Sequence, residues 1–177
     1  GPTGSGKTTT LYSFLNAIQN KQIVTLEDPV ETHLEGVRQS PIQIDSGYDF
    51  VKGLRAILRQ DPDVIMIGEI RDKESAKIAL EAAHTGHLVL STLHTSTCKE
   101  SLLRLASFDL DPYLISHSLK GIISQQLLHS PCRSCQQKTH GTFHSPGCHD
   151  CSYRGFSGRA PICDILALDH LDSFSYH

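Results

Sequence analysis

The stretch GPTGSGKT at residues 1–8 decides the fold of this chain. It matches the pattern G-x-x-x-x-G-K-[ST], with Gly1, Gly6, Lys7 and Thr8 at the defining positions. In a loop of this kind the glycines let the backbone curl so that its N–H groups point at phosphate oxygens. The lysine reaches the β- and γ-phosphates of a nucleotide, and the threonine hydroxyl ligates Mg²⁺. The candidate nucleotide-binding residues are Gly1, Pro2, Thr3, Gly4, Ser5, Gly6, Lys7, Thr8 and Thr9, with Thr8 as the magnesium ligand.

The residues after the loop predict a helix. Apolar side chains recur at helical spacing over residues 8–20, which places the loop at a helix N-terminus, where bound anions are favoured. A plain Gly/Ser/Thr turn before a helix is the alternative. A phosphate-binding loop also follows a strand. We therefore expect the first strand of the sheet to precede Gly1 and to be missing from this chain.

The rest of the chain alternates between strand and helix patterns. The predicted strands are Ile23–Leu26, Val64–Ile67 and His87–Leu93. The predicted helices are Phe50–Arg59, Lys73–His84, Lys99–Ser107 and Pro112–His129. This alternation predicts an α/β fold, a parallel sheet flanked by helices, with its ligand at the carboxyl ends of the strands.

A second stretch, LRQDPDVIMIGEIRD at residues 58–72, sets a short apolar run among charged residues. The run reads as a buried strand, so Glu69 emerges at its carboxyl end, on the same edge of the sheet as the phosphate loop. Hydrolysis of a γ-phosphate requires a positioned water and neutralisation of negative charge, which makes Glu69 the candidate acid. The alternative is an ordinary loop ion pair between Glu69 and Arg71 or Lys73.

Composition excludes some classes of protein. With 177 residues the chain fits one domain with a small appendage. A formal net charge of −3 shows no basic excess, so direct binding to nucleic acid is not expected. The apolar runs are far shorter than the roughly 20 residues that a membrane-spanning helix needs.

Four of the six cysteines form two C-x-x-C pairs, Cys132 with Cys135 and Cys148 with Cys151. Two such knuckles can fold onto one tetrahedral zinc ion, and four thiolate ligands favour a structural site. Disulfides are the alternative, and His140, His144 and His149 lie near enough in sequence to compete as ligands. We interpret the remaining Cys98 and Cys163 as core or near-surface thiols.

Four motifs in this order resemble a known family: GPTGSGKT, TLEDPVE at residues 25–31, LRQDPDVIMIGEIRD, and TGHLVLSTLHT at residues 85–95. Together they are similar to the secretion ATPase superfamily, specifically the type II secretion and type IV pilus assembly ATPases. The resemblance implies a RecA-like P-loop NTPase that binds ATP and Mg²⁺ and acts as a homo-hexamer. It further implies a cytoplasmic location, peripheral at the inner membrane, with a membrane platform protein as partner.

The resemblance also implies roles for individual residues. Glu69 stands at the family's atypical Walker B glutamate, and Glu27 is a second acid near Mg²⁺ or the attacking water. His87 and His94 match the histidine box and would contact the γ-phosphate, with His94 the stronger candidate. The matching arginines, which would supply charge to a neighbouring subunit's nucleotide, are Arg55 and Arg59.

The expected organisation has three parts. Residues 1–129 form the RecA-like ATPase core, without its first strand and the family's N-terminal domain. Residues 130–153 form a tetracysteine zinc insertion, and residues 154–177 form a truncated C-terminal segment. The insertion resembles the assembly and secretion branch, which favours export or extension over retraction.

The implied function is ATP hydrolysis that powers assembly of a type IV pilus or a type II secretion pseudopilus. The alternative is a degenerate, non-hydrolysing scaffold of the same machinery. Two departures from the family pattern, Ser96 and Gln126, and the expected absence of the flanking segments are what favour that alternative.

Overall fold

The computed structural model describes residues 1–139 and 142–168. Its central sheet has four parallel strands in the order β2-β1-β3-β4. The strands are β1 (Ile23–Glu27), β2 (Val37–Pro41), β3 (Val64–Ile67) and β4 (Leu88–Ser91). The predicted α/β fold with a parallel sheet is confirmed. Strand β2 was not predicted because it is a polar edge strand in which only Val37 is buried.

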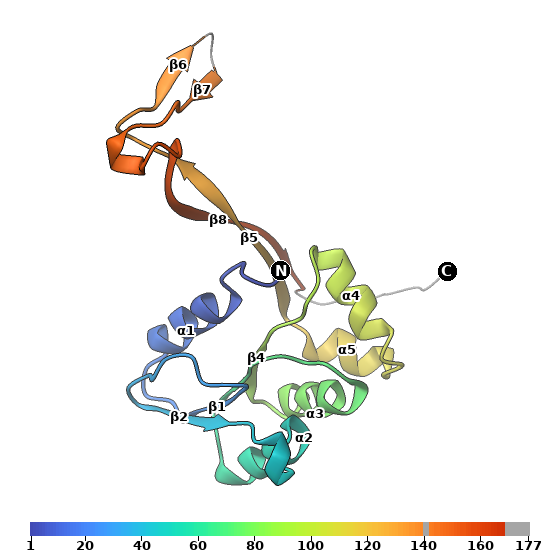
Figure 1. Cartoon of the computed structure of the whole chain (residues 1–177). Coiled ribbons are helices and arrows are strands. Elements are labelled where there is room, and N and C mark those ends of the chain that lie inside the picture. The colour runs from blue at the N-terminus through green and yellow to red at the C-terminus, as the bar shows by residue number, and fades with distance from the viewer. Residues whose placement is uncertain (140–141, 169–177) are drawn as a thin grey trace.

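Helices cover both faces of this sheet (Figure 1). They are α1 (Lys7–Ala17), α2 (Phe50–Ile57), α3 (Lys73–His84), α4 (Cys98–Ala106) and α5 (Pro112–Ser118). Single 3-10 turns occur at Ile44–Ser46, Leu58–Gln60 and His149–Cys151. Helices α2 to α5 start at residues whose side chains cap them. In α3, for example, Asp72 accepts a hydrogen bond from the Ser75 backbone N–H at 2.8 Å. Within the described residues, no helix is long and apolar enough to span a bilayer.

The two-residue period of the strands divides the core into two layers. On one face of the sheet, Leu26 and Ile65 pack with α2 and α3. On the other face, Ile23 and Met66 pack with α1. All five residues of β1 are buried, so this strand carries side chains into both layers. Glu27 lies two and four residues after Thr25 and Ile23, and therefore faces α1.

The C-terminal part of the chain forms a projecting arm (Figure 1). Strand β5 (Gly121–Pro131) pairs antiparallel with β8 (Phe156–Ala167), and the short strands β6 (Gln137–Thr139) and β7 (Thr142–His144) lie near the tip. We refer to residues 121–167 as the arm and to residues 1–120 as the body.

The predicted helix Pro112–His129 is therefore wrong beyond its first turns. Helix α5 ends at Ser118, and Leu119 has extended backbone angles. The residues that follow begin β5, whose pairing partner comes only at Phe156–Ala167. Because this partner is distant in sequence, local periodicity favoured continuation of the helix.

A hollow of about 350 Å³ lies beside β4, the edge strand of the sheet. Apolar side chains of α1, α3, β4 and β5 line it, together with Gly1. The strand predicted before the phosphate loop would precede Gly1, so the structure does not test that prediction.

Candidate functional site

A second hollow, of about 390 Å³, lies at the carboxyl edge of the sheet. Its volume falls in the range of small-ligand sites. The phosphate loop, the ends of β1, β3 and β4, and two residues of the arm contribute to its walls. The polar residues that line it include Thr3, Lys7, Thr8, Thr9, Glu27, Asp28, Glu31, Glu69, Thr92, His94 and Arg159.

The phosphate loop ends where α1 begins. Gly6 occupies the N-cap position with φ 84°, a left-handed conformation that favours glycine. Because Gly6 has no side chain to cap the helix, the first N–H groups of α1 are available to an anion. Lys7 Nζ donates to the backbone oxygens of Gly1 at 2.8 Å and Pro2 at 2.9 Å. Burial lowers the pKa of Lys7, while the charge of Glu69 acts in the opposite direction.

Glu69 follows β3 at the same edge. Its carboxylate accepts a hydrogen bond from Arg71, and His94 Nε2 lies 3.0 Å from its second oxygen. The Arg71 guanidinium holds the pKa of Glu69 below its usual range, with a smaller contribution from His94. The side chain is only 19% exposed. The structure thus places Glu69 in the hollow as a carboxylate and also pairs it with Arg71.

Gly68 brings two strand ends close together at this point. Its N–H donates to the Leu26 oxygen at 2.7 Å, and a Cβ at this position would lie 3.2 Å from the same oxygen. The Thr92 hydroxyl donates to the Gly68 oxygen at 2.7 Å. The ends of β1, β3 and β4 are therefore tied together directly behind Glu69.

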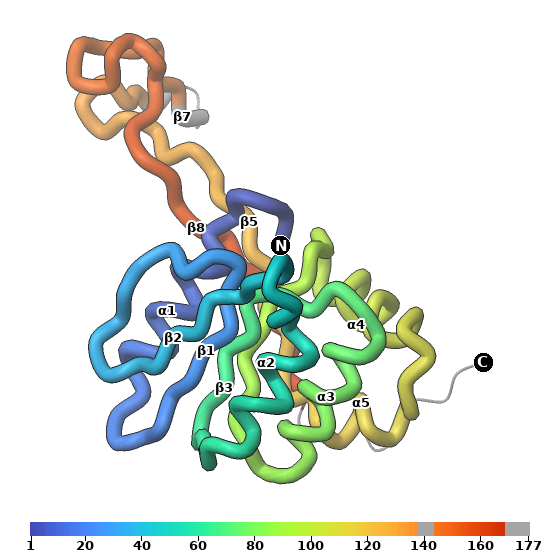
Figure 2. Tube along the Cα trace, turned by 60° about the horizontal axis from the view of Figure 1, so that its bottom comes forward, coloured from blue at the N-terminus to red at the C-terminus, as the bar shows by residue number. Residues whose placement is uncertain are grey.

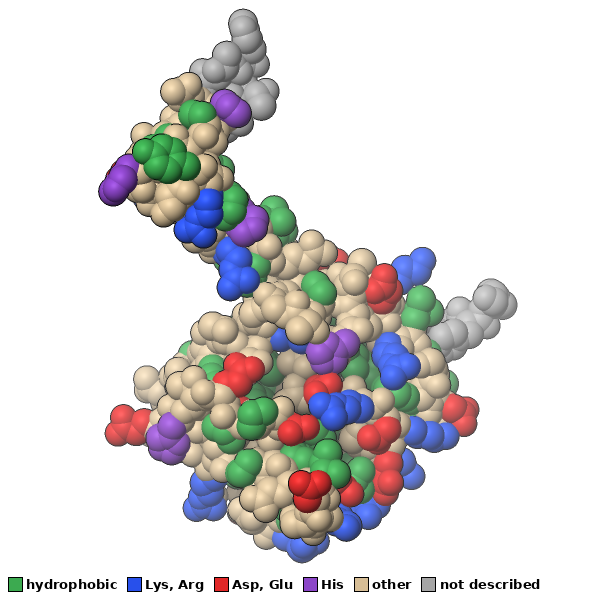
Figure 3. All heavy atoms as spheres, in the orientation of Figure 1, with side chains coloured by type: hydrophobic (Ala, Val, Ile, Leu, Met, Phe, Trp, Pro, Cys, Tyr) green, Lys and Arg blue, Asp and Glu red, His purple; other side chains and the backbone are tan. Residues whose placement is uncertain are grey.

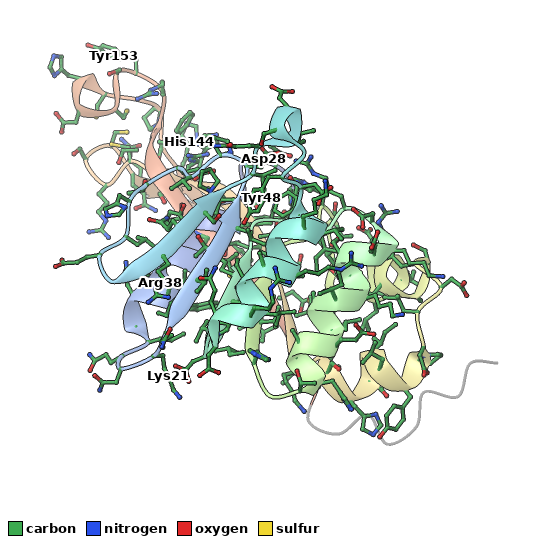
Figure 4. All side chains as sticks on the ribbon, turned by 90° about the horizontal axis from the view of Figure 1, so that it is seen from below. Lys21, Asp28, Arg38, Tyr48, His144 and Tyr153 are labelled. Carbon is green, nitrogen blue, oxygen red and sulfur yellow. The ribbon has the colours of Figure 1, made fainter. Side chains whose placement is uncertain are left out.

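Glu27 is buried, and hydrogen bonds hold both of its oxygens. Thr25 Oγ1 and Gln39 Nε2 donate to one oxygen at 2.6 and 3.0 Å, and the Tyr12 hydroxyl donates to the other. Burial and this hydrogen bond raise the pKa of Tyr12 to about 12. Asp28, labelled in Figure 4, follows Glu27 and lies 3.4 Å from Arg71. Glu27 is thus fixed in the wall of the hollow, while its neighbour contacts Arg71.

The four C-x-x-C sulfurs converge in the arm. The Sγ atoms of Cys132, Cys135, Cys148 and Cys151 all lie within 4.8 Å of one another, and three of the separations are 3.8, 3.9 and 4.0 Å. Thiolates at about 2.3 Å from a tetrahedral zinc would lie about 3.8 Å apart, so the set fits this ion. The Cys148 N–H donates to Cys151 Sγ at 3.1 Å and lowers the pKa of that thiol to about 6.

Among the residues that the structure describes, no further ligand joins these four cysteines, which we call the tetracysteine knuckle. His144 and His149 are exposed, and His140 lies outside the described residues. All six cysteines are free thiols. Cys98 is buried and Cys163 is exposed, as expected for a core and a near-surface thiol.

Comparison with known proteins identifies the family. A family model described as type II/IV secretion system protein matches residues 1–176. The chain belongs to this family.

Curated relatives agree with this assignment. Type II secretion system protein E of Dickeya dadantii is 45% identical over 186 residues, covering 96% of this chain and 37% of that protein. Type II secretion system ATPase E of Vibrio cholerae is 41% identical over 188 residues, with the same coverages of 96% and 37%. The chain thus spans little more than a third of the length of these relatives.

Solved structures show the same fold. The pilus retraction motor PilT with bound ADP superposes with a TM-score of 0.72 at 33% identity, covering 97% of this chain and 47% of that one. The ATPase DotB of Legionella pneumophila superposes with a TM-score of 0.69 at 29% identity, covering 96% and 44%. These neighbours confirm the predicted ATPase fold.

The predicted site residues of this family member are brought together only in part. Lys7, Glu69 and His94 line one hollow. His87 precedes β4, at its amino end, where Nδ1 lies 3.0 Å from the Ala82 oxygen. His87 and His94 thus lie at opposite ends of β4, His87 at the amino end and His94 beyond the carboxyl end.

The two predicted arginines also lie outside this hollow. Arg55 is on the outer surface of α2, 58% exposed, and pairs with Glu74 at 2.8 Å. Arg59 is exposed in the 3-10 turn that follows. An exposed position is what a contribution to a neighbouring subunit requires, but one chain does not test it.

Sequence reasoning missed residues that tertiary contacts bring to the site. Arg159 of β8 lines the hollow because β8 pairs with β5, where Arg159 lies opposite His129. Tyr12 reaches Glu27 because both face the layer between α1 and the sheet. For Tyr12 a sequence signal existed, since it lies one turn after Thr8. For Arg159 no local signal existed.

Proposed function

We propose that this chain carries the ATPase site of a secretion-system motor. The observation that supports the proposal is the convergence of Lys7, Glu69 and His94 on one hollow at the start of α1. A lysine, a carboxylate and helix N–H groups at one sheet edge are the groups that phosphoryl transfer requires. The family membership and the ATPase neighbours favour the same function.

Each residue then has a chemical role. The N–H groups of the loop and the Lys7 ammonium bind the phosphates of ATP, and the Thr8 hydroxyl would hold Mg²⁺. This ion, when bound, neutralises phosphate charge. The Glu69 carboxylate orients the attacking water and accepts its proton, while Arg71 keeps that carboxylate ionised. His94 donates to the γ-phosphate, and Glu27 acts as a fixed second acid.

Arg71 and His94 compete with water for Glu69 in this structure. The carboxylate is bonded to both side chains at once. Hydrolysis therefore requires that His94 turn from Glu69 toward the γ-phosphate. A movement of this kind would couple phosphate binding to release of the Glu69 carboxylate from His94.

The proposal extends to the whole machine. We infer that the full protein forms a hexamer on the cytoplasmic side of the inner membrane and binds a platform protein there. Arg55 and Arg59 would act across its subunit contacts. Hydrolysis would power assembly of a type II secretion pseudopilus or a type IV pilus. Acidic and basic side chains are interspersed on the face of the body in Figure 3, which favours protein partners over nucleic acid.

The tetracysteine knuckle is proposed as a structural zinc site. Its four sulfurs leave no ligand position for substrate, and their spacing fits the ion. Zinc, when bound, would crosslink the Cys132–Cys135 pair to the Cys148–Cys151 pair. His144 and His149 are then solvent-exposed neighbours.

A non-hydrolysing scaffold is the second candidate. The observation that favours it is that Lys7 bonds to Gly1 and Pro2, and Glu69 to Arg71, so both groups already have partners within the chain. A scaffold would bind nucleotide without turnover.

The test is ATP turnover by the full-length natural protein that contains this chain, beside its Glu69→Gln variant. We expect turnover to fall by roughly 10²- to 10⁴-fold, the usual contribution of a positioned base, with Mg-ADP binding retained. Glu81→Gln, an exposed change on α3, is the matched control and should keep wild-type turnover. Nucleotide binding without turnover in all three proteins would establish the scaffold instead.

A further inference from the structure

One side chain of the arm is buried against the phosphate loop. Gln125 of β5 is 6% exposed. Its Nε2 donates to the Ser5 backbone oxygen at 2.6 Å, and its Oε1 accepts from Thr10 Oγ1 at 2.7 Å. Because a carbonyl oxygen only accepts, the amide nitrogen must face Ser5, which fixes the orientation of the side chain. One amide thus joins the loop to the first turn of α1.

The backbone of β5 also packs directly on the loop. A Cβ added at Gly1 would lie 2.3 Å from the Gln125 backbone oxygen, and one at Gly6 would lie 3.0 Å from Gln125 Nε2. At Gly4, by contrast, a Cβ would meet nothing within 4 Å among the described residues. Figures 1 and 2 both show the N-terminus beside β5. The outer glycines of the motif therefore leave room for the strand as well as for phosphate.

We propose that Gln125 is a positioning residue for phosphate binding. Resting on the function proposed above, the inference is that its amide holds the loop in its anion-binding shape before a nucleotide arrives. The loop is a short irregular segment, and ordering it on binding would reduce affinity. The amide nitrogen of Gln125 binds the loop at Ser5, and its oxygen binds Thr10 of the helix that the loop precedes.

The residue next to Gln125 supplies a matched control. Gln126 has the same side chain, is exposed, and points to the opposite face of β5 because side chains alternate along a strand. Its pairing partner in β8 is Ile162. Gln126→Ala therefore removes a glutamine amide that points away from the phosphate loop, whereas Gln125→Ala removes the amide that contacts the loop.

Two measurements on the full-length protein test the proposal. Hydrogen exchange of the amides of residues 4–9, without nucleotide, should be about tenfold faster in Gln125→Ala and unchanged in Gln126→Ala. The Kd for Mg-ADP, measured by calorimetry, should rise about tenfold in Gln125→Ala and less than twofold in Gln126→Ala. A tenfold change corresponds to about 1.4 kcal/mol, within the range for loss of one hydrogen-bonding group from a buried pair.

Two further variants separate positioning from a general loss of packing. Thr10→Val removes only the donor to Oε1, and its effect on the Kd should not add to that of Gln125→Ala. Gln125→Glu places a carboxylate against the Ser5 oxygen, and its protonated form can again donate there. Its Kd, relative to wild type at the same pH, should therefore recover toward acid pH, whereas a packing defect would show no such dependence.

The outcomes distinguish this inference from the proposed function. If loop exchange and Mg-ADP affinity in Gln125→Ala match those of Gln126→Ala, the positioning role is overturned. If neither the wild type nor any of the variants binds Mg-ADP, the proposed function fails. The hydrogen-exchange result still decides whether Gln125 holds the loop.

Discussion

The body and the arm are stabilised by different means. In the body, side chains such as Leu26, Ile65 and Met66 are completely buried between the sheet and its helices. In the arm, nearly every residue of β8 is exposed, and Ile162 and Ile165 are 56% and 68% exposed. Tyr153, labelled in Figure 4, is 76% exposed in the knuckle. The body therefore depends on apolar burial, of which the described part of the arm has little outside its cysteines.

This difference indicates that the four cysteine sulfurs stabilise the arm by binding zinc. A two-stranded hairpin alone is marginally stable in water. A structural zinc ion contributes about 10–16 kcal/mol in small zinc-finger peptides, far more than the half-exposed side chains of the arm can supply. The outer arm should therefore depend on the metal, and its inner end on contacts with the body such as those of Gln125.

The largest expected effect is at the knuckle. Cys132→Ser should lower zinc content from about one ion per chain to near zero, because tetrahedral structural sites need all four ligands. We expect the arm beyond β5 to become protease-sensitive. The body should change little, since all five α-helices of the described residues lie within it. Metal analysis, limited proteolysis and circular dichroism at 222 nm measure these three results.

The matched control is Cys163→Ser, which makes the same change at an exposed thiol outside the knuckle. It should leave zinc content and protease resistance as in wild type. Full zinc retention in Cys132→Ser would mean that Cys132 is not required as a ligand, and the tetracysteine assignment would then be wrong.

An intermediate effect is expected in the body core. Leu26→Ala removes a side chain that is 0% exposed at the centre of the sheet. Buried leucine-to-alanine changes cost about 2–5 kcal/mol, so the urea midpoint followed at 222 nm should fall markedly. Zinc content should not change, because the site is in the other region.

Ile162→Ala is the corresponding change in the arm. With its side chain 56% exposed, the cost should stay below about 0.5 kcal/mol. Equal losses of stability in the two variants would mean that the arm buries apolar surface as the body does, and the contrast between the regions would fail.

The same contrast explains what the sequence could predict. Strands β1, β3 and β4 and helices α1 to α4 have local signals: buried apolar runs, helical periodicity, and caps such as Asp72. The rule that ligands bind at the carboxyl ends of parallel strands then placed Lys7, Glu69 and His94 together. The cysteine spacing predicted the knuckle for a similar reason, since metal ligands come in short motifs.

The arm itself lacked such signals. Strands β5 and β8 pair with 24 residues between Pro131 and Phe156, and neither strand is buried enough to show a hydrophobic pattern. Residues that the arm brings to the site, Gln125 and Arg159, were missed for this reason. His87 was grouped with His94 by a motif alone, and the length of β4 separates the two side chains.

A small effect on stability is also expected at Glu69, in the hollow at the carboxyl edge of the sheet. Because the pKa of Glu69 is lowered in the folded protein, its ionised form is more strongly favoured in the folded state than in the unfolded state. The resulting stabilisation is present above the ordinary glutamate value of 4.5 and is lost as pH falls through the lower folded-state pKa. Because its partner Arg71 is 51% exposed, solvent screening limits this contribution to about 0.5–1 kcal/mol.

Glu69→Gln should therefore unfold at lower urea concentration than wild type at pH 7, and the difference should shrink below pH 4.5. The measurement is the urea midpoint at 222 nm from pH 7 to pH 3.5, with Glu81→Gln as the exposed control. A variant more stable than wild type at pH 7 would indicate that Glu69 is strained by its neighbours, as a group positioned for chemistry often is. In that case the ion pair with Arg71 would be a feature of the site's function, and the stability of the body would depend on apolar burial alone.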